Sequence, residues 1–533
     1  MTALLKQAQA ALTAGNAQAA LQASQAAVRA NPNDATAHYL SAAALRLAGR
    51  AGEALKTLDM LNRQIPDQPD LINMAGLCRR DMGDRAGAQR DFEQVVRLRP
   101  DHAPAIGNLA SLLAGPAPEK AIPLFEKLAA LQPQNPEPLA IATGLSLRLR
   151  DLDGAKALAG RAASIDPDAW LVRSAQAAIA LAEDDAGTAR TRLEPVMASA
   201  RGAPALLATA WGRLAEACHK LKDPAAAFNA WQSANDIQRA ASQDRFATYD
   251  GPRSLASAER LANWFSNHDP APPEVADLTG PAPVFQVGFP RSGTTLLEQM
   301  LDAHPDIETL EEQDAIGPVI RAVGDRPETL SRLDTLSAAD INAIRAAYWQ
   351  QARPDGPPPS GRIFIDKYPM NLVWLGPLMR IFPDAKIILC LRDPRDCVLS
   401  AFQQRFAVNP EMYRTLRIGE CAQLYDAAMR AGQAALASKH AVPVHALRYE
   451  DLIADWRPEI TRALEFLGAG WHDEVAAYRE RAANKAIKTP SAPQVVKPLY
   501  KGAIGKWSAY RFVLEPALPV LAPWIDKYGY EAS

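Results

Sequence analysis

Three short apolar segments in the second half of the chain each end in residues that could bind an anion. The first segment, VFQVGF, lies in the stretch VFQVGFPRSGTTLLEQML. It runs into the G-x-x-x-x-G loop GFPRSG, which is followed by Thr294 and Thr295. Backbone N–H groups in such a turn, together with the start of the next helix, can surround a tetrahedral anion. A nucleoside-triphosphate loop carries lysine after its second glycine, but here Thr294 takes that place and Arg291 supplies the positive charge. The loop therefore predicts an anion site and argues against a kinase or an NTPase.

The other two segments end in cationic residues. RIFI is followed by Asp366 and Lys367. KIILCL is followed by RDPRDCVLS, which begins with Arg392 at the end of the apolar run and contains Ser400 eight residues later. An arginine and a hydroxyl that meet at a helix start can hold a phosphate. Two alternatives remain open, since a lysine at a strand end is commonly a solvated surface charge and RDPRD could only cap a helix and form ion pairs.

These residues require a framework that brings the ends of the three runs together. After residue 280, short apolar runs alternate with helical patterns, which is typical of a parallel sheet covered by helices. Ligands of such sheets bind beyond the carboxyl ends of the strands. We therefore expect an α/β domain over 282–533 with a P-loop-like phosphate site and a central parallel sheet. The Pro- and Asp-rich stretch 241–281 is interpreted as a linker.

The first half of the chain repeats with a step of 34 residues. Glycines and prolines recur in one phase, at Gly15, Gly49 and Gly83 and at Pro32, Pro66 and Pro100. This phase resembles the tetratricopeptide repeat, with a turn glycine between two helices and a proline after the second. The resemblance implies an all-α solenoid over 1–240. Its concave face would bind a protein or peptide, and the alternative is a spacer or a homodimerisation arm.

Composition narrows the class of partners. The 533-residue chain has a formal net charge of −2, so it is not expected to attract nucleic acid or an anionic membrane as a whole. Five scattered cysteines without a C-x-x-C pair favour a reducing compartment. Without a secretory signal pattern or a long apolar run, the sequence predicts a cytoplasmic protein with no membrane span.

Taken together, the motifs resemble those of sulfotransferases that use 3′-phosphoadenosine 5′-phosphosulfate (PAPS). The resemblance covers roughly residues 282–530. It implies a 5′-phosphosulfate loop made of Pro290, Arg291, Ser292, Gly293, Thr294 and Thr295. It also implies that Arg392 and Ser400 hold the 3′-phosphate. Repeats joined to such a domain are a known bacterial arrangement.

A nearer resemblance is to the tyrosylprotein sulfotransferases, through PRSGTTLLEQMLDAHPDIETLEEQ. It implies that Glu312 is the base for the acceptor hydroxyl and that Lys367 and Arg291 act at the transferring sulfuryl group. Tyr449 matches a tyrosine near the nucleotide. Ser491 and Lys497 match a late loop that closes over the cofactor. No metal is expected, because a sulfuryl group carries less charge than a phosphoryl group.

Departures from this family leave the acceptor open. Gln404 stands where the tyrosine-specific enzymes have an arginine, and the tail LYKGAIGKWSAYR is closer to the general bacterial and carbohydrate-directed branch. Peptide tyrosine is the leading hypothesis, and a carbohydrate or small-molecule hydroxyl is the alternative. An acidic, solvated helix start is the alternative interpretation of Glu312. A non-catalytic repeat scaffold with a degenerate nucleotide domain is the alternative from a different class.

Overall fold

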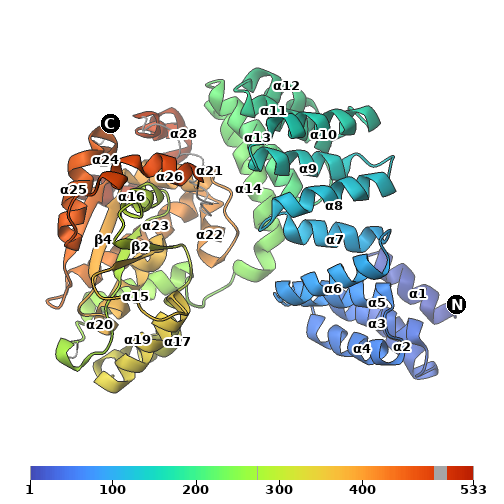
Figure 1. Ribbon diagram of the computed structural model, residues 1–533, viewed down its shortest axis with the longest axis horizontal. Helices are drawn as coiled ribbons and strands as arrows, with labels where there is room; N and C mark the ends of the chain where they lie inside the picture. The colour runs from blue at the N-terminus through green and yellow to red at the C-terminus, as the bar shows by residue number, and fades with distance from the viewer. Residues whose placement is uncertain (1, 273, 485–500, 532–533) are drawn as a thin grey trace. The chain divides into compact units, whose positions relative to one another are not determined.

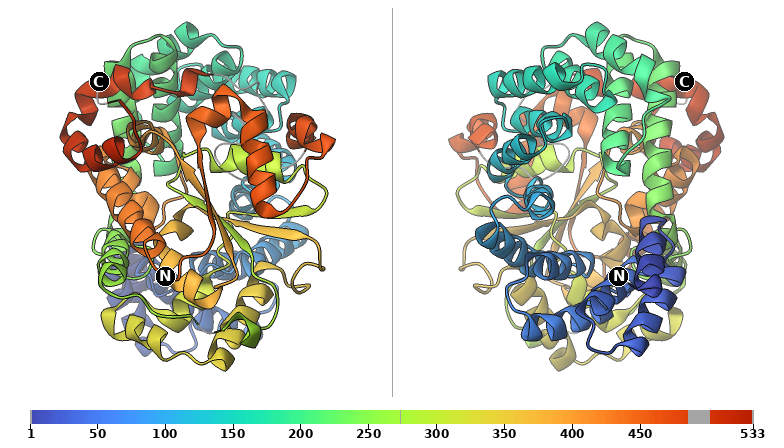
Figure 2. Two further views of the ribbon diagram at one scale, coloured as in Figure 1. Left: turned by 90° about the vertical axis from the view of Figure 1, so that its left-hand side faces the viewer. Right: turned by 90° about the vertical axis from the view of Figure 1, so that its right-hand side faces the viewer.

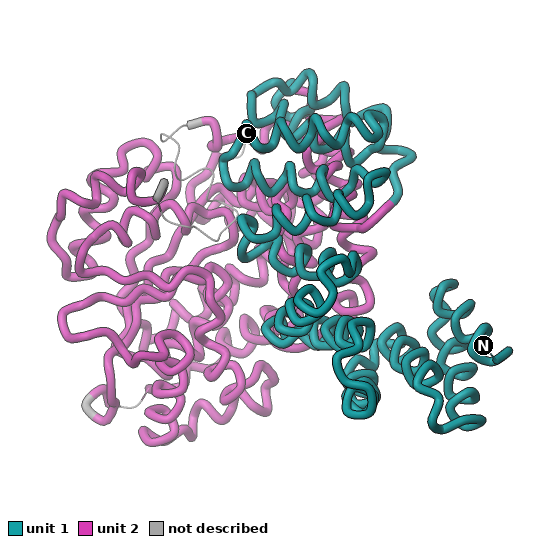
Figure 3. The backbone as a smooth tube through the Cα atoms, turned by 45° about the vertical axis from the view of Figure 1, so that its right-hand side comes forward, with its two compact units in different colours: residues 1–201, 216–221 teal, residues 202–215, 222–533 magenta. Residues whose placement is uncertain are grey.

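The computed structural model describes residues 2–272, 274–484 and 501–531 (Figure 1). They form two compact units, one of residues 1–201 with 216–221 and the other of residues 202–215 with 222–533 (Figure 3). The division falls within one helix, α13 (Pro204–Lys220). Each unit is described separately.

Unit 1 is a solenoid of paired antiparallel helices. Their bounds are α1 Ala3–Thr13, α2 Ala17–Ala30, α3 Ala35–Leu47, α4 Ala51–Gln64, α5 Pro69–Asp81, α6 Arg85–Leu98, α7 Ala103–Leu113, α8 Pro118–Leu131, α9 Glu137–Arg148, α10 Leu152–Ile165, α11 Trp170–Ala182 and α12 Ala186–Met197. The repeating glycines lie at the turn inside a pair, where Gly15, Gly49 and Gly83 adopt φ of 70°, 75° and 86°. Glycine reaches such angles without the steric cost of a Cβ. The helical-repeat prediction is confirmed.

Small residues explain how the paired helices approach each other. A Cβ on Gly76 in α5 would lie 2.6 Å from the ring of Phe92 in α6, so only glycine fits there without a shift. Ala8, Ala42, Ala54 and Ala88 are fully buried at their repeat positions. The solenoid core therefore depends on small side chains as well as on leucines.

Unit 2 contains a five-stranded sheet in which all strands are parallel, in the order β2-β3-β1-β4-β5. Figure 2 draws its strands as arrows. The strands are β1 Val284–Gly288, β2 Ile307–Glu311, β3 Ile363–Lys367, β4 Lys386–Leu391 and β5 Val444–Arg448. The three apolar runs of the sequence form β1, β3 and β4, the three central strands. The predicted parallel sheet is confirmed.

Helices surround this sheet. Their bounds are α14 Pro224–Phe246, α15 Leu255–Asn267, α16 Thr294–Leu301, α17 Gly317–Val323, α18 Pro327–Leu330, α19 Ala338–Ala352, α20 Leu375–Ile381, α21 Pro394–Gln403, α22 Pro410–Thr415, α23 Ile418–Leu436, α24 Tyr449–Ala454, α25 Trp456–Leu467, α26 Tyr478–Asn484, α28 Arg511–Leu514 and α29 Leu518–Lys527. The stretch 241–281, expected as a linker, includes α15. Leu261 and Trp264 of α15 are buried, and the helix packs against α23.

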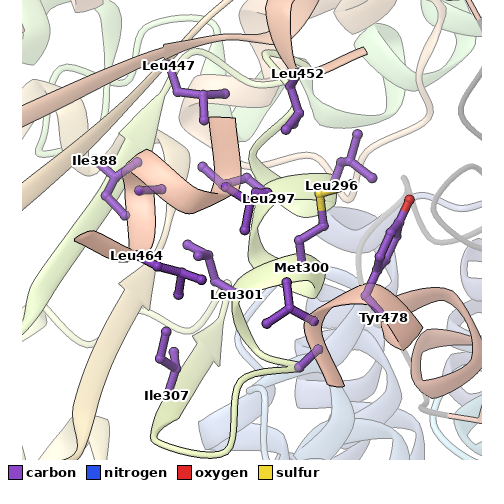
Figure 4. Close-up of a cluster of buried hydrophobic side chains, with 14 of the residues drawn as sticks. Leu296, Leu297, Met300, Leu301, Ile307, Ile388, Leu447, Leu452, Leu464 and Tyr478 are labelled. Atoms are coloured by element: carbon purple, nitrogen blue, oxygen red, sulfur yellow. The ribbon is translucent and has the colours of Figure 1, made fainter. Parts of the chain in front are cut away.

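The apolar face of α16 fixes the loop that precedes it. Figure 4 shows Leu297 and Leu301 of α16 lying among side chains of the sheet, such as Ile388, and of α25, such as Leu464. Leu297, Met300 and Leu301 are fully buried. Burying a leucine or methionine side chain contributes about 1.5–3 kcal/mol, so this face holds the start of α16 firmly against the sheet.

Candidate active site

The turn between β1 and α16 has a backbone that few residues adopt. Arg291 has φ 73° and Gly293 has φ 94°, both in the left-handed region. A Cβ on Gly293 would lie 2.7 Å from the ring of Tyr449, so glycine lets this ring close over the loop. The first N–H groups of α16 have no acceptor inside the helix and carry the positive end of its dipole. Gln286 in β1 donates a 2.7 Å hydrogen bond to the Thr294 carbonyl, which anchors the helix start.

A cavity of about 520 Å³ opens beside this turn, at the carboxyl ends of the strands. Most of the predicted site residues line it: Pro290, Arg291, Gly293, Thr294, Thr295, Glu312, Arg392, Ser400 and Tyr449. Ser292 and Lys367 are buried and do not line the cavity. The predicted residues Ser491 and Lys497 lie outside the described residues. The sheet thus brings together residues that are up to 159 positions apart, the span from Pro290 to Tyr449.

Lys367, the last residue of β3, lies between two carboxylates. Its Nζ is 3.0 Å from Glu298 Oε2 and 3.0 Å from Glu312 Oε1. The side chains of Lys367 and Glu298 are 0% exposed, whereas that of Glu312 is 35% exposed toward the cavity. Burial raises the pKa of Glu298 to about 7, while nearby Lys367 acts to lower it. The structure therefore excludes the alternative that Lys367 is a solvated surface charge.

Glu312 directly follows β2, at a bend of the chain. Its N–H donates a 2.9 Å hydrogen bond to the Lys367 carbonyl, and its φ is 42°. A left-handed backbone at a glutamate is costly and is typical of functional sites. The next helix, α17, begins only at Gly317, so Glu312 does not lie at a helix start as the alternative interpretation had it.

Arg291, which is partly buried, and Arg392, which is buried, meet at the other side of the loop. Arg291 Nε donates to Ser400 Oγ at 3.0 Å, and Arg392 donates to the Arg291 carbonyl at 2.9 Å. Burial, and then the charge of Arg392, lower the pKa of Arg291 to about 10. Arg392 Nε has no hydrogen-bond partner among the described residues, although it is buried. Two guanidinium groups held this close call for an anion between or beside them.

The rest of RDPRD has the structural role that the alternative interpretation gave it. Asp393 accepts from the N–H of Arg395 at the start of α21 and pairs with its guanidinium at 2.8 Å. Asp396 accepts hydrogen bonds from the N–H groups of Gly505 (2.7 Å) and Trp507 (2.9 Å). The motif thus ties the C-terminal segment to the wall of the cavity while Arg392 faces its interior.

Four charged residues of the site were not predicted as site residues, and one of them is Asp396, described above. Glu298 pairs with Lys367, and Lys506 and Glu411 line the cavity. Lys506 lies in the tail KGAIGKW, and burial, followed by the charge of Arg392, lowers its pKa. Among the other three, a signal existed for Glu298 alone, because a glutamate among the apolar residues of LLEQML is unusual.

Two further findings concern the described part of the chain only. Among these residues, no cluster of His, Cys, Asp and Glu has the arrangement of a metal site. None of the helices described is both long and apolar enough to cross a membrane.

Comparison with known families gives two matches. Residues 283–473 match the sulfotransferase family, and residues 5–69 and 73–136 match the tetratricopeptide repeat. The first span contains the residues that line the cavity except Ala503 and Lys506, and the other two lie in the first helix pairs of unit 1.

Individual proteins are similar to parts of this chain, and two of them are protein-tyrosine sulfotransferases. Protein-tyrosine sulfotransferase 1 of Homo sapiens is 31% identical over 262 residues, which cover 46% of this chain and 69% of that protein. Protein-tyrosine sulfotransferase 1 of Danio rerio is 29% identical, with 46% and 72% covered. An uncharacterised protein of Aquifex aeolicus (strain VF5) is 27% identical over 271 residues, 46% of this chain but only 34% of that protein. Among solved structures, a tetratricopeptide repeat protein from Parabacteroides merdae aligns with 44% of this chain and 91% of its own, at 15% identity and a TM-score of 0.37.

Proposed function

The chain belongs to the sulfotransferase family and carries tetratricopeptide repeats in its N-terminal part, and from this premise we propose that it transfers the sulfuryl group of PAPS to an acceptor hydroxyl. The observation that carries the proposal is the meeting of two sets of residues at one cavity. Arg291, Arg392 and Ser400 form an anion site, and the ion pair of buried Lys367 with the exposed Glu312 adjoins it.

The residues present fit this donor. The unsatisfied Nε of Arg392 and the hydroxyl of Ser400 suit a 3′-phosphate, and the turn 290–295 suits the 5′-phosphosulfate. Lys506 adds a third cation to the same wall. A nucleoside triphosphate has no 3′-phosphate, so it would leave the Nε of Arg392 unsatisfied.

In the proposed mechanism, Glu312 takes the proton of the acceptor hydroxyl. The acceptor oxygen forms a bond to sulfur while the bond from sulfur to the 5′-phosphate oxygen breaks. The electron pair of the broken bond leaves with adenosine 3′,5′-bisphosphate. Arg291 and Lys367 stabilise the negative charge that develops on the bridging and sulfonate oxygens. Glu298 holds Lys367 at the end of β3 from below.

Peptide tyrosine is the acceptor that we propose first. The Glu311-Glu312 pair and the similarity to two protein-tyrosine sulfotransferases support it. The repeat unit would recruit the acceptor protein or a partner in the cytoplasm. A carbohydrate or small-molecule hydroxyl remains the second candidate, because Gln404 lines the cavity where the tyrosine-specific pattern has arginine.

Binding of the donor's product tests the nucleotide assignment. Adenosine 3′,5′-bisphosphate should raise the melting temperature, whereas ATP with magnesium should not. Arg392→Ala should weaken the affinity for the bisphosphate by about tenfold to a hundredfold in calorimetry, since it removes a charged hydrogen bond. Arg417→Ala is the matched control, because Arg417 forms an ion pair with Asp236 and does not line the cavity. Equal affinities of wild type and Arg392→Ala would contradict the assignment.

A further inference from the structure

The charged residues that line the cavity separate into two groups. The cations are Arg291, Arg392 and Lys506, and Arg392 donates a 2.9 Å hydrogen bond to the Arg291 carbonyl. Asp396 lies with them and is occupied by the N–H groups of residues 505 and 507. Among the described residues, the carboxylates that remain to face the cavity are Glu312 and Glu411.

Tyr368 connects the surroundings of Glu312 with those of Glu411. It follows Lys367, whose Nζ is 3.0 Å from Glu312, and its ring lies 4.6 Å from Arg253, which is 3.7 Å from Glu411. Glu312, Tyr368 and Glu411 all line the cavity. If the sulfuryl group is transferred at Glu312, the acceptor extends from there toward Tyr368 and Glu411.

Glu411 is buried without a hydrogen bond. Its side chain is 2% exposed, and neither carboxylate oxygen accepts a hydrogen bond from any residue that the structure describes. Its nearest cation is Arg253, at 3.7 Å, which is an ion-pair distance and too long for a hydrogen bond. Burying an ionised carboxylate without a hydrogen bond costs free energy unless a donor reaches it. Because Glu411 lines the cavity, a donor can reach it from there.

Arg253 does not neutralise Glu411 fully, because it is shared. It donates a 2.6 Å hydrogen bond to Asp314 and lies 4.6 Å from the centre of the Tyr368 ring. One guanidinium therefore serves two carboxylates, and the group of Arg253, Asp314 and Glu411 has an excess negative charge whenever Glu411 is ionised. Burial raises the pKa of Glu411 to about 7, so a cation arriving from the cavity would also favour its ionised form.

We propose that Glu411 recognises a cationic group of the acceptor, such as an ammonium, close to the hydroxyl that receives the sulfuryl group. This inference rests on the proposed function and deepens it by naming the class of acceptor. The aromatic and apolar wall beside Glu411, formed by Tyr368, Phe406 and Met412, suits the ring or chain that joins the two groups. The site therefore favours hydroxyl acceptors that carry a positive charge and disfavours those that carry a negative one.

Two phenols of opposite charge test this inference. Tyramine carries an ammonium, and 3-(4-hydroxyphenyl)propionate carries a carboxylate on a similar skeleton. With PAPS as donor, kcat/KM for tyramine should exceed that for the propionate by about tenfold or more, as expected for a charged hydrogen bond. In Glu411→Gln this ratio should fall toward one, mainly through a higher KM for tyramine. Glu308→Gln is the matched control, since Glu308 pairs with Arg353 and does not line the cavity.

Binding separates this inference from the proposed function. Calorimetry with the full chain and adenosine 3′,5′-bisphosphate should show tighter binding of tyramine than of the propionate, without any turnover. Equal affinities, or no measurable tyramine binding, would overturn the inference, and the wild-type comparison decides this even if Glu411→Gln fails to fold. Preferential tyramine binding without sulfate transfer would instead contradict the proposed function.

Discussion

Lys367 carries one positive charge and meets two carboxylates, so its environment depends on which of them is ionised. Burial raises the pKa of Glu298 to about 7, and Glu298 therefore holds a proton for part of the time at neutral pH. The exposed partner, Glu312, stays in contact with Lys367 at 3.0 Å and faces the cavity. Lys367 thereby orients the proposed base before an acceptor arrives.

Replacement of Glu312 tests its proposed role as the base. Glu312→Gln should lower turnover by roughly 10²–10⁴-fold, because it removes the proton acceptor but keeps the shape of the side chain. The affinity for adenosine 3′,5′-bisphosphate should change little, since the anion site lies on the other side of the loop. Steady-state kinetics and calorimetry measure the two quantities.

The neighbouring glutamate provides the control for Glu312. Glu311 ends β2 and does not line the cavity, so Glu311→Gln should keep turnover near that of the wild type. Wild-type turnover in Glu312→Gln would remove this residue from the mechanism.

The sequence predicted the residues that belong to a local motif and missed those that act through tertiary contacts. Arg291, Thr294 and Arg392 follow apolar runs at recognisable spacings, and the structure places them around one cavity. Glu411 has no such signal, because its neighbours Arg253 and Tyr368 are 158 and 43 positions away in the chain. Its environment could be known only from the folded structure.

At the scale of elements, the loop before α16 depends on one glycine. Gly293 has φ 94° and lies under the ring of Tyr449, whereas Gly468 has φ 88° at the end of α25, with no atom nearer to its added Cβ than 4.0 Å. Both positions would strain an alanine by about 1–3 kcal/mol. They differ in what surrounds them, because Gly293 lines the cavity.

This pair of glycines gives a matched test. Gly293→Ala should weaken binding of adenosine 3′,5′-bisphosphate by at least about tenfold, because the Cβ displaces Tyr449 and the loop together. Gly468→Ala should lower the melting temperature without changing that affinity. Similar affinities of the two variants in calorimetry would show that the loop does not hold the nucleotide.

Strand β3 carries a buried acid whose titration should affect stability. Burial raises the pKa of Asp366 from 3.8 to about 7, and the hydroxyl of Tyr348 donates to it at 3.1 Å. Below about pH 4 this carboxyl is protonated in both the folded and the unfolded chain. As the pH rises to 7, the unfolded chain releases the proton first, so the stabilising contribution declines and is lost above about pH 7.

An amide at this position removes the titration. Asp366→Asn should therefore gain roughly 2–4 kcal/mol of unfolding free energy relative to the wild type between pH 4 and pH 8. Parallel melting curves at the two pH values measure this change. A difference between variant and wild type that does not vary with pH would show that Asp366 is ionised in the folded protein across that range.

The strands that the sequence missed are the two edges of the sheet. The central strands β1, β3 and β4 are apolar runs, as expected for strands covered on both faces. The edge strands β2 and β5 read IETLE and VHALR, and several of their residues are partly exposed. Edge strands need fewer apolar residues, so an apolar run that would identify them as strands is shorter or absent.

For the whole molecule, the sequence predicted a helical solenoid followed by an α/β domain, but not how the end of the solenoid region packs. Residues 211–240, within the region expected to be a solenoid, form the end of α13 and most of α14. Within unit 2, however, Asn235 of α14 donates to the Phe402 carbonyl at 2.9 Å, and Arg239 pairs with Glu420 at 2.7 Å. A repeat pattern does not indicate such contacts, because it reports only which face of each helix is apolar.

The proposal that this cavity moves a sulfuryl group from PAPS to a hydroxyl can be tested directly. The full chain is incubated with sulfur-labelled PAPS and tyramine or a tyrosine-containing peptide, and the label is followed by chromatography and mass spectrometry. We expect a labelled acceptor that carries one sulfuryl group, formed with an equal amount of adenosine 3′,5′-bisphosphate and lost in Glu312→Gln. Label that never leaves the nucleotide for any hydroxyl acceptor, including those of a host-cell lysate, would contradict it.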